Sequence, residues 1–132
     1  MANAIYPKYK EAVLTSAANS SLAGTLKATL VDTSAYTYSA AHEFLSSLAG
    51  IVGTAHILNS KSYTDGVFDA ADVTFPAVTG NSVEAIVLYT DTGNANTSRL
   101  VAYLDTGFTG LPVTPNGGDI TVTWNASGIF AL

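Results

Sequence analysis

Apolar and polar residues alternate along much of this chain, which is typical of β-strands that bury one face. The clearest early example is residues 25–31 (TLKATLV), where apolar side chains at positions 26, 28 and 30 alternate with polar ones at 25, 27 and 29. Because successive side chains of a strand point to opposite faces, this period of two predicts a half-buried strand.

From residue 50 onward the pattern consists almost wholly of short strands and turns. Seven strands are predicted, at Gly53–Leu58, Gly66–Phe68, Asp72–Phe75, Val83–Thr90, Ser98–Asp105, Asp119–Trp124 and Gly128–Leu132. Clusters of Gly, Asn and Asp separate them, and the turn at 91–96 joins two of them into the clearest hairpin. Short strands with such punctuation predict a mainly β fold, an antiparallel β-sandwich that resembles a jelly roll.

The N-terminal half adds one or two short helices to this prediction. One is expected over residues 9–18, and another over 40–48, where Ser39 would cap the start and Gly50 would end it. Residues 1–9 belong to no periodic element, so we expect an N-terminal arm. Residues 1–132 otherwise show no internal boundary and predict a single domain.

Charge is scarce, and this narrows the classes of partner. Only 11% of the residues are charged, against about 25% in an average domain. Interface cores are depleted in charge, so this favours a subunit of an assembly over a β-rich extracellular domain. The net charge of −5 and five scattered basic residues argue against nucleic acid. No apolar run is long enough for a membrane span, and the N-terminus lacks a signal-peptide pattern.

Two Asp-Thr-Gly triplets, at 91–93 and 105–107, imitate the signature of aspartic proteases, in which two carboxylates share a proton. In the predicted hairpin the two aspartates would stand at opposite ends, about 20 Å apart at 3.3 Å per residue. A dimer could still pair one triplet from each chain. The residues after the triplets, Asn94 and Phe108, depart from the small residue that the protease pattern requires, so the protease signature is incomplete.

Other catalytic or metal-binding patterns are weak. On a helix the neighbours His42 and Glu43 would point about 100° apart and could not serve one substrate atom. His42 and His56 have no third ligand at a metal-site spacing. Two groups of acidic and amide residues could hold a structural cation, although turns collect such residues for backbone reasons. These groups are Asp65, Asp69 and Asp72, and Asp91, Asn94 and Asn96. We therefore expect no enzyme activity and no cofactor.

Tyrosines gather in the N-terminal half, outside the best strands. Large half-polar rings near arms and loops suit interfaces, which leads to a predicted contact surface of Ile5, Tyr6, Pro7, Tyr9, Tyr36 and Tyr38. The alternative is that the rings fill the rim of the sandwich. A carbohydrate-binding platform is a further alternative, but it normally uses several Trp, and the single Trp124 alternates with Val122 and Ile120 as a core residue does.

Several segments together resemble small structural proteins of tailed bacteriophages, in particular capsid cement (decoration) proteins. They are YPKYKEAVL (6–14), LKATLVDTSAYTYSAAHEFLSSL (26–48), VFDAADVTFPAV (67–78), EAIVLYTDTGNANTSRLVAYLDTG (84–107) and GLPVTPNGGDITVTWNASGIFAL (110–132). The resemblance implies a β-sandwich or jelly-roll subunit, made in the bacterial cytoplasm, that forms trimers or dimers on the outer capsid surface and clamps the major capsid protein. A tail, baseplate or neck component would fit the same features.

Overall fold

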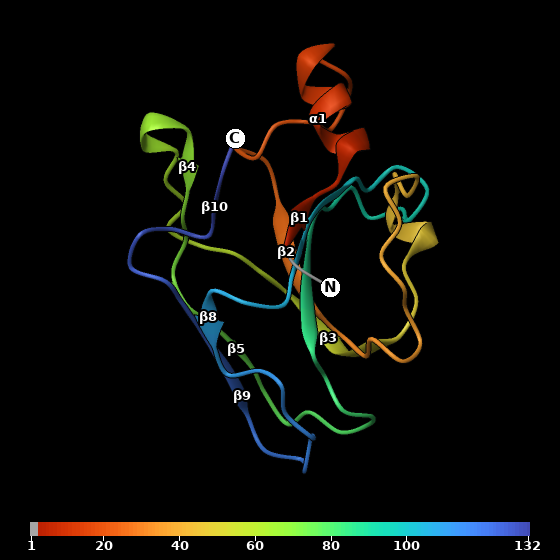
Figure 1. Ribbon diagram of the computed structural model, residues 1–132, viewed down its shortest axis with the longest axis vertical. Coiled ribbons are helices and arrows are strands. Elements are labelled where there is room, and N and C mark those ends of the chain that lie inside the picture. Colours follow the sequence, from red (N-terminus) through yellow and green to blue (C-terminus); the bar gives the residue numbers. More distant parts are fainter. Residues whose placement is uncertain (1–2) are drawn as a thin grey trace.

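An antiparallel sheet of five strands is the largest element of the computed structural model, which describes residues 3–132 (Figure 1). In spatial order the strands are β1 (Ala4–Ile5), β7 (Leu100–Leu104), β6 (Ala85–Thr90), β2 (Leu26–Val31) and β3 (Ile51–Ile57). The predicted hairpin is present, because β6 and β7 pair antiparallel with Val87 opposite Tyr103. The mainly β, antiparallel fold is therefore confirmed.

A smaller sheet packs beside the first and completes a sandwich-like arrangement (Figure 1). It consists of β5 (Val73–Phe75), β9 (Ile120–Trp124) and β8 (Phe108–Thr109), while β4 (Val67–Phe68) pairs separately with β10 (Phe130–Ala131). Along β9 the side chains of Ile120, Val122 and Trp124 are buried and the threonines between them are exposed. This confirms Trp124 as a core residue, and its indole N–H donates to the carbonyl of Ala71 at 3.1 Å.

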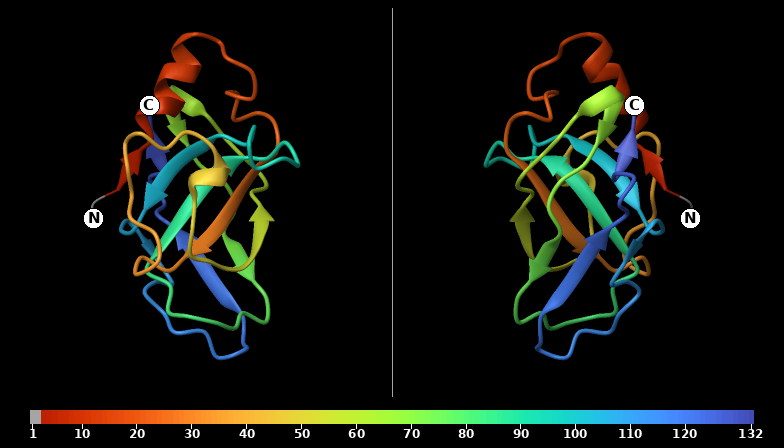
Figure 2. Two further views of the ribbon diagram at one scale, coloured as in Figure 1. Left: turned by 90° about the vertical axis from the view of Figure 1, so that its right-hand side faces the viewer. Right: turned by 90° about the vertical axis from the view of Figure 1, so that its left-hand side faces the viewer.

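The opposite face of the large sheet is covered by residues 32–50, which cross it without regular strands (Figure 2). Rings from this segment lie on Tyr103 of β7, with the Tyr38 ring 5.6 Å away between centroids. As a result Thr29, on the face of β2 predicted to be exposed, is fully buried. The half-buried strand was therefore a wrong prediction, because a two-residue period cannot reveal what covers the polar side.

The predicted helix over 40–48 is also absent. The Ser39 hydroxyl accepts a hydrogen bond from the amide of Ala41 at 3.2 Å, but the turn does not continue into a helix. Phe44 is extended and bridges to Arg99 beside β7, and only η1 (Leu45–Ser47) is helical, as a 3-10 turn. Pairing with the sheet therefore takes precedence over the local start and stop signals of a helix.

Gly50 has a different role from the predicted helix stop. Its φ of +69° lies in the left-handed region, and a Cβ there would lie 2.7 Å from the carbonyl oxygen of Asp32. The carbonyl of Gly50 accepts the amide of Asp32 at 2.9 Å. Glycine is required at this close approach, which joins the two ends of segment 32–50.

The N-terminal segment is docked onto the fold, contrary to the predicted free arm. β1 extends the large sheet by pairing with β7, and the helix α1 (Pro7–Leu14) follows at once. Proline at the first helical turn suits this start, since its missing N–H would have no partner there.

The remaining 3-10 turn is η2 (Thr64–Gly66). Residues 1 and 2 of the predicted arm lie outside the described residues. Within residues 3–132, no helix has the length and apolar character needed to cross a membrane.

Candidate functional site

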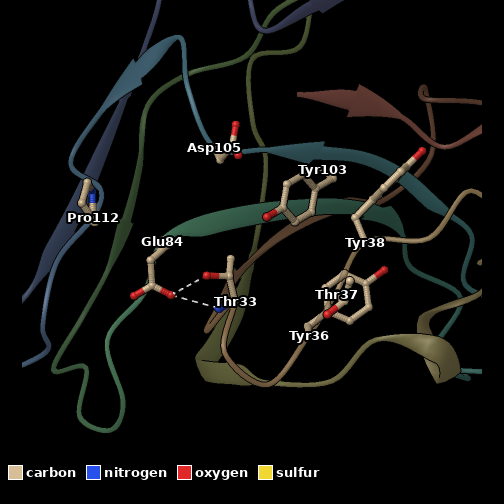
Figure 3. A pocket seen from close by; sticks show the side chains of 8 residues that line it. All are labelled: Thr33, Tyr36, Thr37, Tyr38, Glu84, Tyr103, Asp105 and Pro112. Carbon is tan, nitrogen blue, oxygen red and sulfur yellow. Dashed lines mark hydrogen bonds between the residues drawn. The ribbon is translucent and has the colours of Figure 1, made fainter. Parts of the chain in front are cut away.

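A cavity of about 520 Å³ opens where segment 32–50 leaves the large sheet (Figure 3). We call it the tyrosine cavity. Its wall is formed by Thr33, Tyr36, Thr37, Tyr38, Glu84, Tyr103, Asp105 and Pro112. Thr33 follows β2, Glu84 precedes β6, and Tyr103 belongs to β7, so the antiparallel ladder sets the positions of these three residues.

The three tyrosines of the cavity form one packed cluster. The centroid of the Tyr103 ring lies 5.6 Å from that of Tyr38 and 6.5 Å from that of Tyr36. The Tyr36 hydroxyl is held from two sides, by the Tyr6 hydroxyl at 2.8 Å and by Nδ1 of His42 at 2.7 Å. Burial raises the pKa of Tyr36, Tyr38 and Tyr103, so their hydroxyls are neutral at physiological pH.

Carboxylates give this region its charge. Oε1 of Glu84 accepts hydrogen bonds from the amide and the hydroxyl of Thr33, at 2.9 and 3.0 Å. Hydrogen bonds from the Ser82 side chain and from Thr33 lower the pKa of Glu84. The hydroxyl and amide of Ser34 lower the pKa of the adjacent, buried Asp32 in the same way. Both groups are therefore ionised at neutral pH.

No lysine or arginine lines the tyrosine cavity. Lys27 pairs with Asp91 at 3.0 Å, and Lys8 pairs with Glu11 at 3.2 Å. Arg99 lies over the Phe44 ring at 5.1 Å and donates from Nε to the carbonyl of Ala18. Lys61 donates to the carbonyl of Leu22. The described wall of the cavity is thus acidic and aromatic, without a lysine or arginine side chain.

The structure buries some of the predicted contact residues and exposes others. Tyr6, Tyr9 and Tyr36 expose 3% or less of their area and pack in the core, so the expectation that these rings project outward is corrected. Ile5 and Tyr38 are partly buried, and Pro7 is exposed. The alternative interpretation, in which tyrosines fill the sandwich, describes Tyr6, Tyr9 and Tyr36. The pairing of β1 with β7 carries Tyr6 inward, and sequence periodicity over two residues could not reveal it.

The two Asp-Thr-Gly triplets lie at opposite ends of the β6–β7 hairpin, as the sequence predicts. Asp91 binds Lys27 with Oδ2 and accepts the amide of Gly93 with Oδ1, a turn role. Asp105 lies instead at the wall of the tyrosine cavity. One chain therefore does not bring the two carboxylates together as a catalytic pair.

The remaining candidate groups are separated as well. His42 contacts the tyrosines, whereas the Glu43 carboxylate lies 4.0 Å from Arg99. His56 packs edge-on against Phe75 in the core. Asp69 and Asp72 accept backbone amides, from Ala70 and Trp124 respectively. Across residues 3–132, the His, Asp and Glu side chains form no group of three that could hold a metal ion.

A second surface feature lies where α1 meets the C-terminus (Figure 1). Here Leu14 is 85% exposed and Leu132 60% exposed, and the large side chains of Val13 and Tyr63 are also exposed. We call these four residues the apolar end. A hollow of about 320 Å³ between α1 and the last strand is lined by Lys10, Val13, Leu14, Ala131 and Leu132. Exposed apolar side chains that lie together, unlike scattered ones, mark contact surfaces.

No model of a known protein family matches this chain, and no curated protein matches its sequence. The tyrosine cavity and the apolar end are therefore interpreted from their own chemistry.

Proposed function

We propose that this protein is a non-enzymatic structural subunit that acts through protein–protein contacts, as a capsid cement protein of a tailed bacteriophage. The observation that carries the proposal is the apolar end, where Leu14 and Leu132 expose most of their area and line one hollow together with Val13. Tyr63 lies next to Val13 and Leu132 in an adjoining hollow. The resemblance of the sequence to phage structural proteins supplies the kind of assembly. The charged fraction of 11% supports an assembled surface.

The proposed mechanism is the burial of apolar area, repeated over a symmetric shell. Burying a leucine side chain on contact with a neighbour contributes about 1.5–3 kcal/mol. A single such contact is modest, but identical contacts linked through an oligomer add as multivalent binding does. In this proposal the subunit forms a homo-oligomer, a trimer in preference to a dimer, and clamps neighbouring copies of the major capsid protein. A tail, baseplate or neck component would use the same surface at another place in the virion.

The test is to place a charge at the apolar end and follow assembly. We expect the purified chain to elute as an oligomer and to co-sediment with capsids of its phage that lack it. The double variant Leu14→Glu and Leu132→Glu should be folded but should lose one or both of these properties. Light scattering coupled to gel filtration and capsid sedimentation measure them.

Ile51→Glu is the matched control. Ile51 lies on β3 at a similar exposure, 47%, and outside the apolar end, so its charge should leave assembly unchanged. A wild-type chain that is monomeric and does not sediment with capsids would overturn the proposal. Sedimentation with tails and not with heads, seen also by electron microscopy of virions, would assign the tail or neck role instead.

A further inference from the structure

We infer that the tyrosine cavity binds the guanidinium group of an arginine side chain that a partner protein presents. The inference rests on the proposed function only in assuming that the partner is a protein. Four properties of the cavity support it: the open face of Tyr38, the Glu84 carboxylate, the accessible hydroxyl of Tyr103, and a described wall without lysine or arginine.

Tyr38 offers a ring face to a flat cation. It is partly exposed and lines the cavity, and it packs at 52° against Tyr103 with the centroids 5.6 Å apart. Guanidinium is planar and weakly hydrated, so it stacks on tyrosine faces more readily than a compact ammonium does. The ring positions are fixed in advance, because Tyr36 behind them is held by Tyr6 and His42.

Glu84 offers the anionic partner. Thr33 uses its Oε1, and a carboxylate has about four acceptor positions in all. Hydrogen bonds from Ser82 and Thr33 hold this carboxylate in its ionised form. An arginine can therefore add a charge-assisted hydrogen bond without displacing Thr33.

The hydroxyl of Tyr103 is a second acceptor that the cavity offers. The Tyr103 side chain is only 3% exposed and lines the cavity, and within residues 3–132 its hydroxyl makes no side-chain hydrogen bond and stays accessible from the cavity. In Figure 3 this hydroxyl points into the cavity, toward the side where Glu84 and Thr33 lie. A phenolic oxygen accepts as well as donates hydrogen bonds, and it usually takes a partner that comes within reach. An N–H donor placed between Glu84 and Tyr103 would supply one.

Charge selects the class of ligand. The cavity has no lysine or arginine in its wall, and four of the five basic side chains of the chain are engaged elsewhere. A quaternary ammonium would satisfy the rings but has no N–H for Glu84 and Tyr103. A lysine has three donors on a compact head, whereas the five N–H groups of arginine spread in one plane and can meet both acceptors while stacking.

The experiment titrates the full chain with the blocked tripeptide acetyl-Gly-Arg-Gly-amide, followed by chemical shifts of the tyrosine rings. Matched peptides carry lysine, or citrulline, which has the shape of arginine without its charge. We expect saturable binding of the arginine peptide with shifts at Tyr38 and Tyr103, weaker binding of the lysine peptide, and none of the citrulline peptide. Added salt should weaken binding, because the attraction is between charges.

Variants assign the contacts. Glu84→Gln should weaken arginine binding about tenfold, as the loss of one charge-assisted hydrogen bond does. Tyr103→Phe should weaken it about threefold and should leave folding intact, because no hydrogen bond within the described chain is lost. Glu11→Gln, which removes the same charge far from the cavity, and Tyr63→Phe are the controls and should bind as the wild type does.

Equal binding of the arginine and citrulline peptides, or unchanged binding in both Glu84→Gln and Tyr103→Phe, would overturn the inference. Tighter binding of free arginine than of the peptide would also overturn it, since the ligand would then be a small molecule. These readouts are independent of oligomer size and capsid sedimentation. A chain that binds the peptide but does not assemble contradicts the proposed function alone, and the reverse result contradicts this inference alone.

Discussion

The tyrosine cavity and the apolar end both face outward, but they are built in opposite ways. In the cavity, Tyr36 is 97% covered and its hydroxyl has two hydrogen-bond partners. At the apolar end, Leu14 leaves 85% of its area in water. Side chains of the first kind stabilise the fold and hold a site in shape, whereas those of the second kind contribute little to the fold. A role for the apolar end must therefore come from contact with another molecule.

The largest expected effect is a difference in unfolding free energy between a variant beneath the tyrosine cavity and a variant at the apolar end. Tyr6→Ala removes a fully buried ring beneath the cavity and should lower the free energy of unfolding by about 3–5 kcal/mol. Leu14→Ala removes an exposed side chain and should change it by no more than about 0.5 kcal/mol. Urea denaturation measures both. Similar losses in the two variants would show that the regions do not differ as described.

Alkaline pH should destabilise the fold through its buried tyrosines, in contrast to the apolar end, where the exposed leucines do not titrate. Burial and the neighbouring Tyr36 hydroxyl raise the pKa of Tyr6 above its usual value, and burial raises that of Tyr9 to about 12. The unfolded chain ionises near pH 10, so the stabilisation is complete below that pH and is lost as the pH rises through the folded-state pKa. A tyrosine that stays neutral in the fold costs about 2.7 kcal/mol of stability at pH 12.

The measurement combines tyrosinate absorbance with circular dichroism during a pH titration. We expect part of the tyrosinate signal to arise together with cooperative unfolding, and the Tyr6→Phe control to lose stability less steeply with pH. If all seven tyrosines ionised before any loss of secondary structure, burial would not govern these pKa values.

The smallest expected effect is a difference in unfolding free energy between variants of two tyrosines that line the tyrosine cavity. Tyr36→Phe would leave the buried hydroxyl of Tyr6 and Nδ1 of His42 without a partner, at a cost of about 1–3 kcal/mol. Tyr38 is partly exposed, and its hydroxyl bonds to no other group in the described part of the chain, so Tyr38→Phe should stay within about 0.5 kcal/mol. Thermal and urea unfolding compare the pair. A loss of equal size in Tyr38→Phe would refute the distinction.

The strands were the most predictable elements, because their signal is local. Each strand predicted from residue 50 onward exists, most of them shortened at the ends, and the hairpin of β6 and β7 is where alternation and turn residues place it. The failures are at positions where distant segments pack. Residues 40–48 lie between helix start and stop signals, but Phe44 bridges to Arg99, and residues 4–5 have no pattern but pair with β7.

The candidate site was predictable only in part. The tyrosines at 36 and 38 stand out in the sequence, and both line the cavity. Glu84 and Tyr103 do not stand out, since each lies in or beside an apolar run that reads as a core strand. The site joins residues from separate segments, and the meeting of Thr33, Glu84 and Tyr103 depends on the register of β2, β6 and β7.

By itself the sequence determined that this chain is mainly β and poor in charge and that its tyrosines gather in the N-terminal half, because periodicity, turn residues and composition act over a few neighbouring positions. The tertiary structure decided which tyrosines are buried and which face of β2 is covered. It also decided that Glu84 and three tyrosines line one cavity. The physical reason is that burial and hydrogen bonding between remote segments contribute more free energy than local propensity does. The outcome at each tyrosine is therefore set by its distant neighbours in the fold.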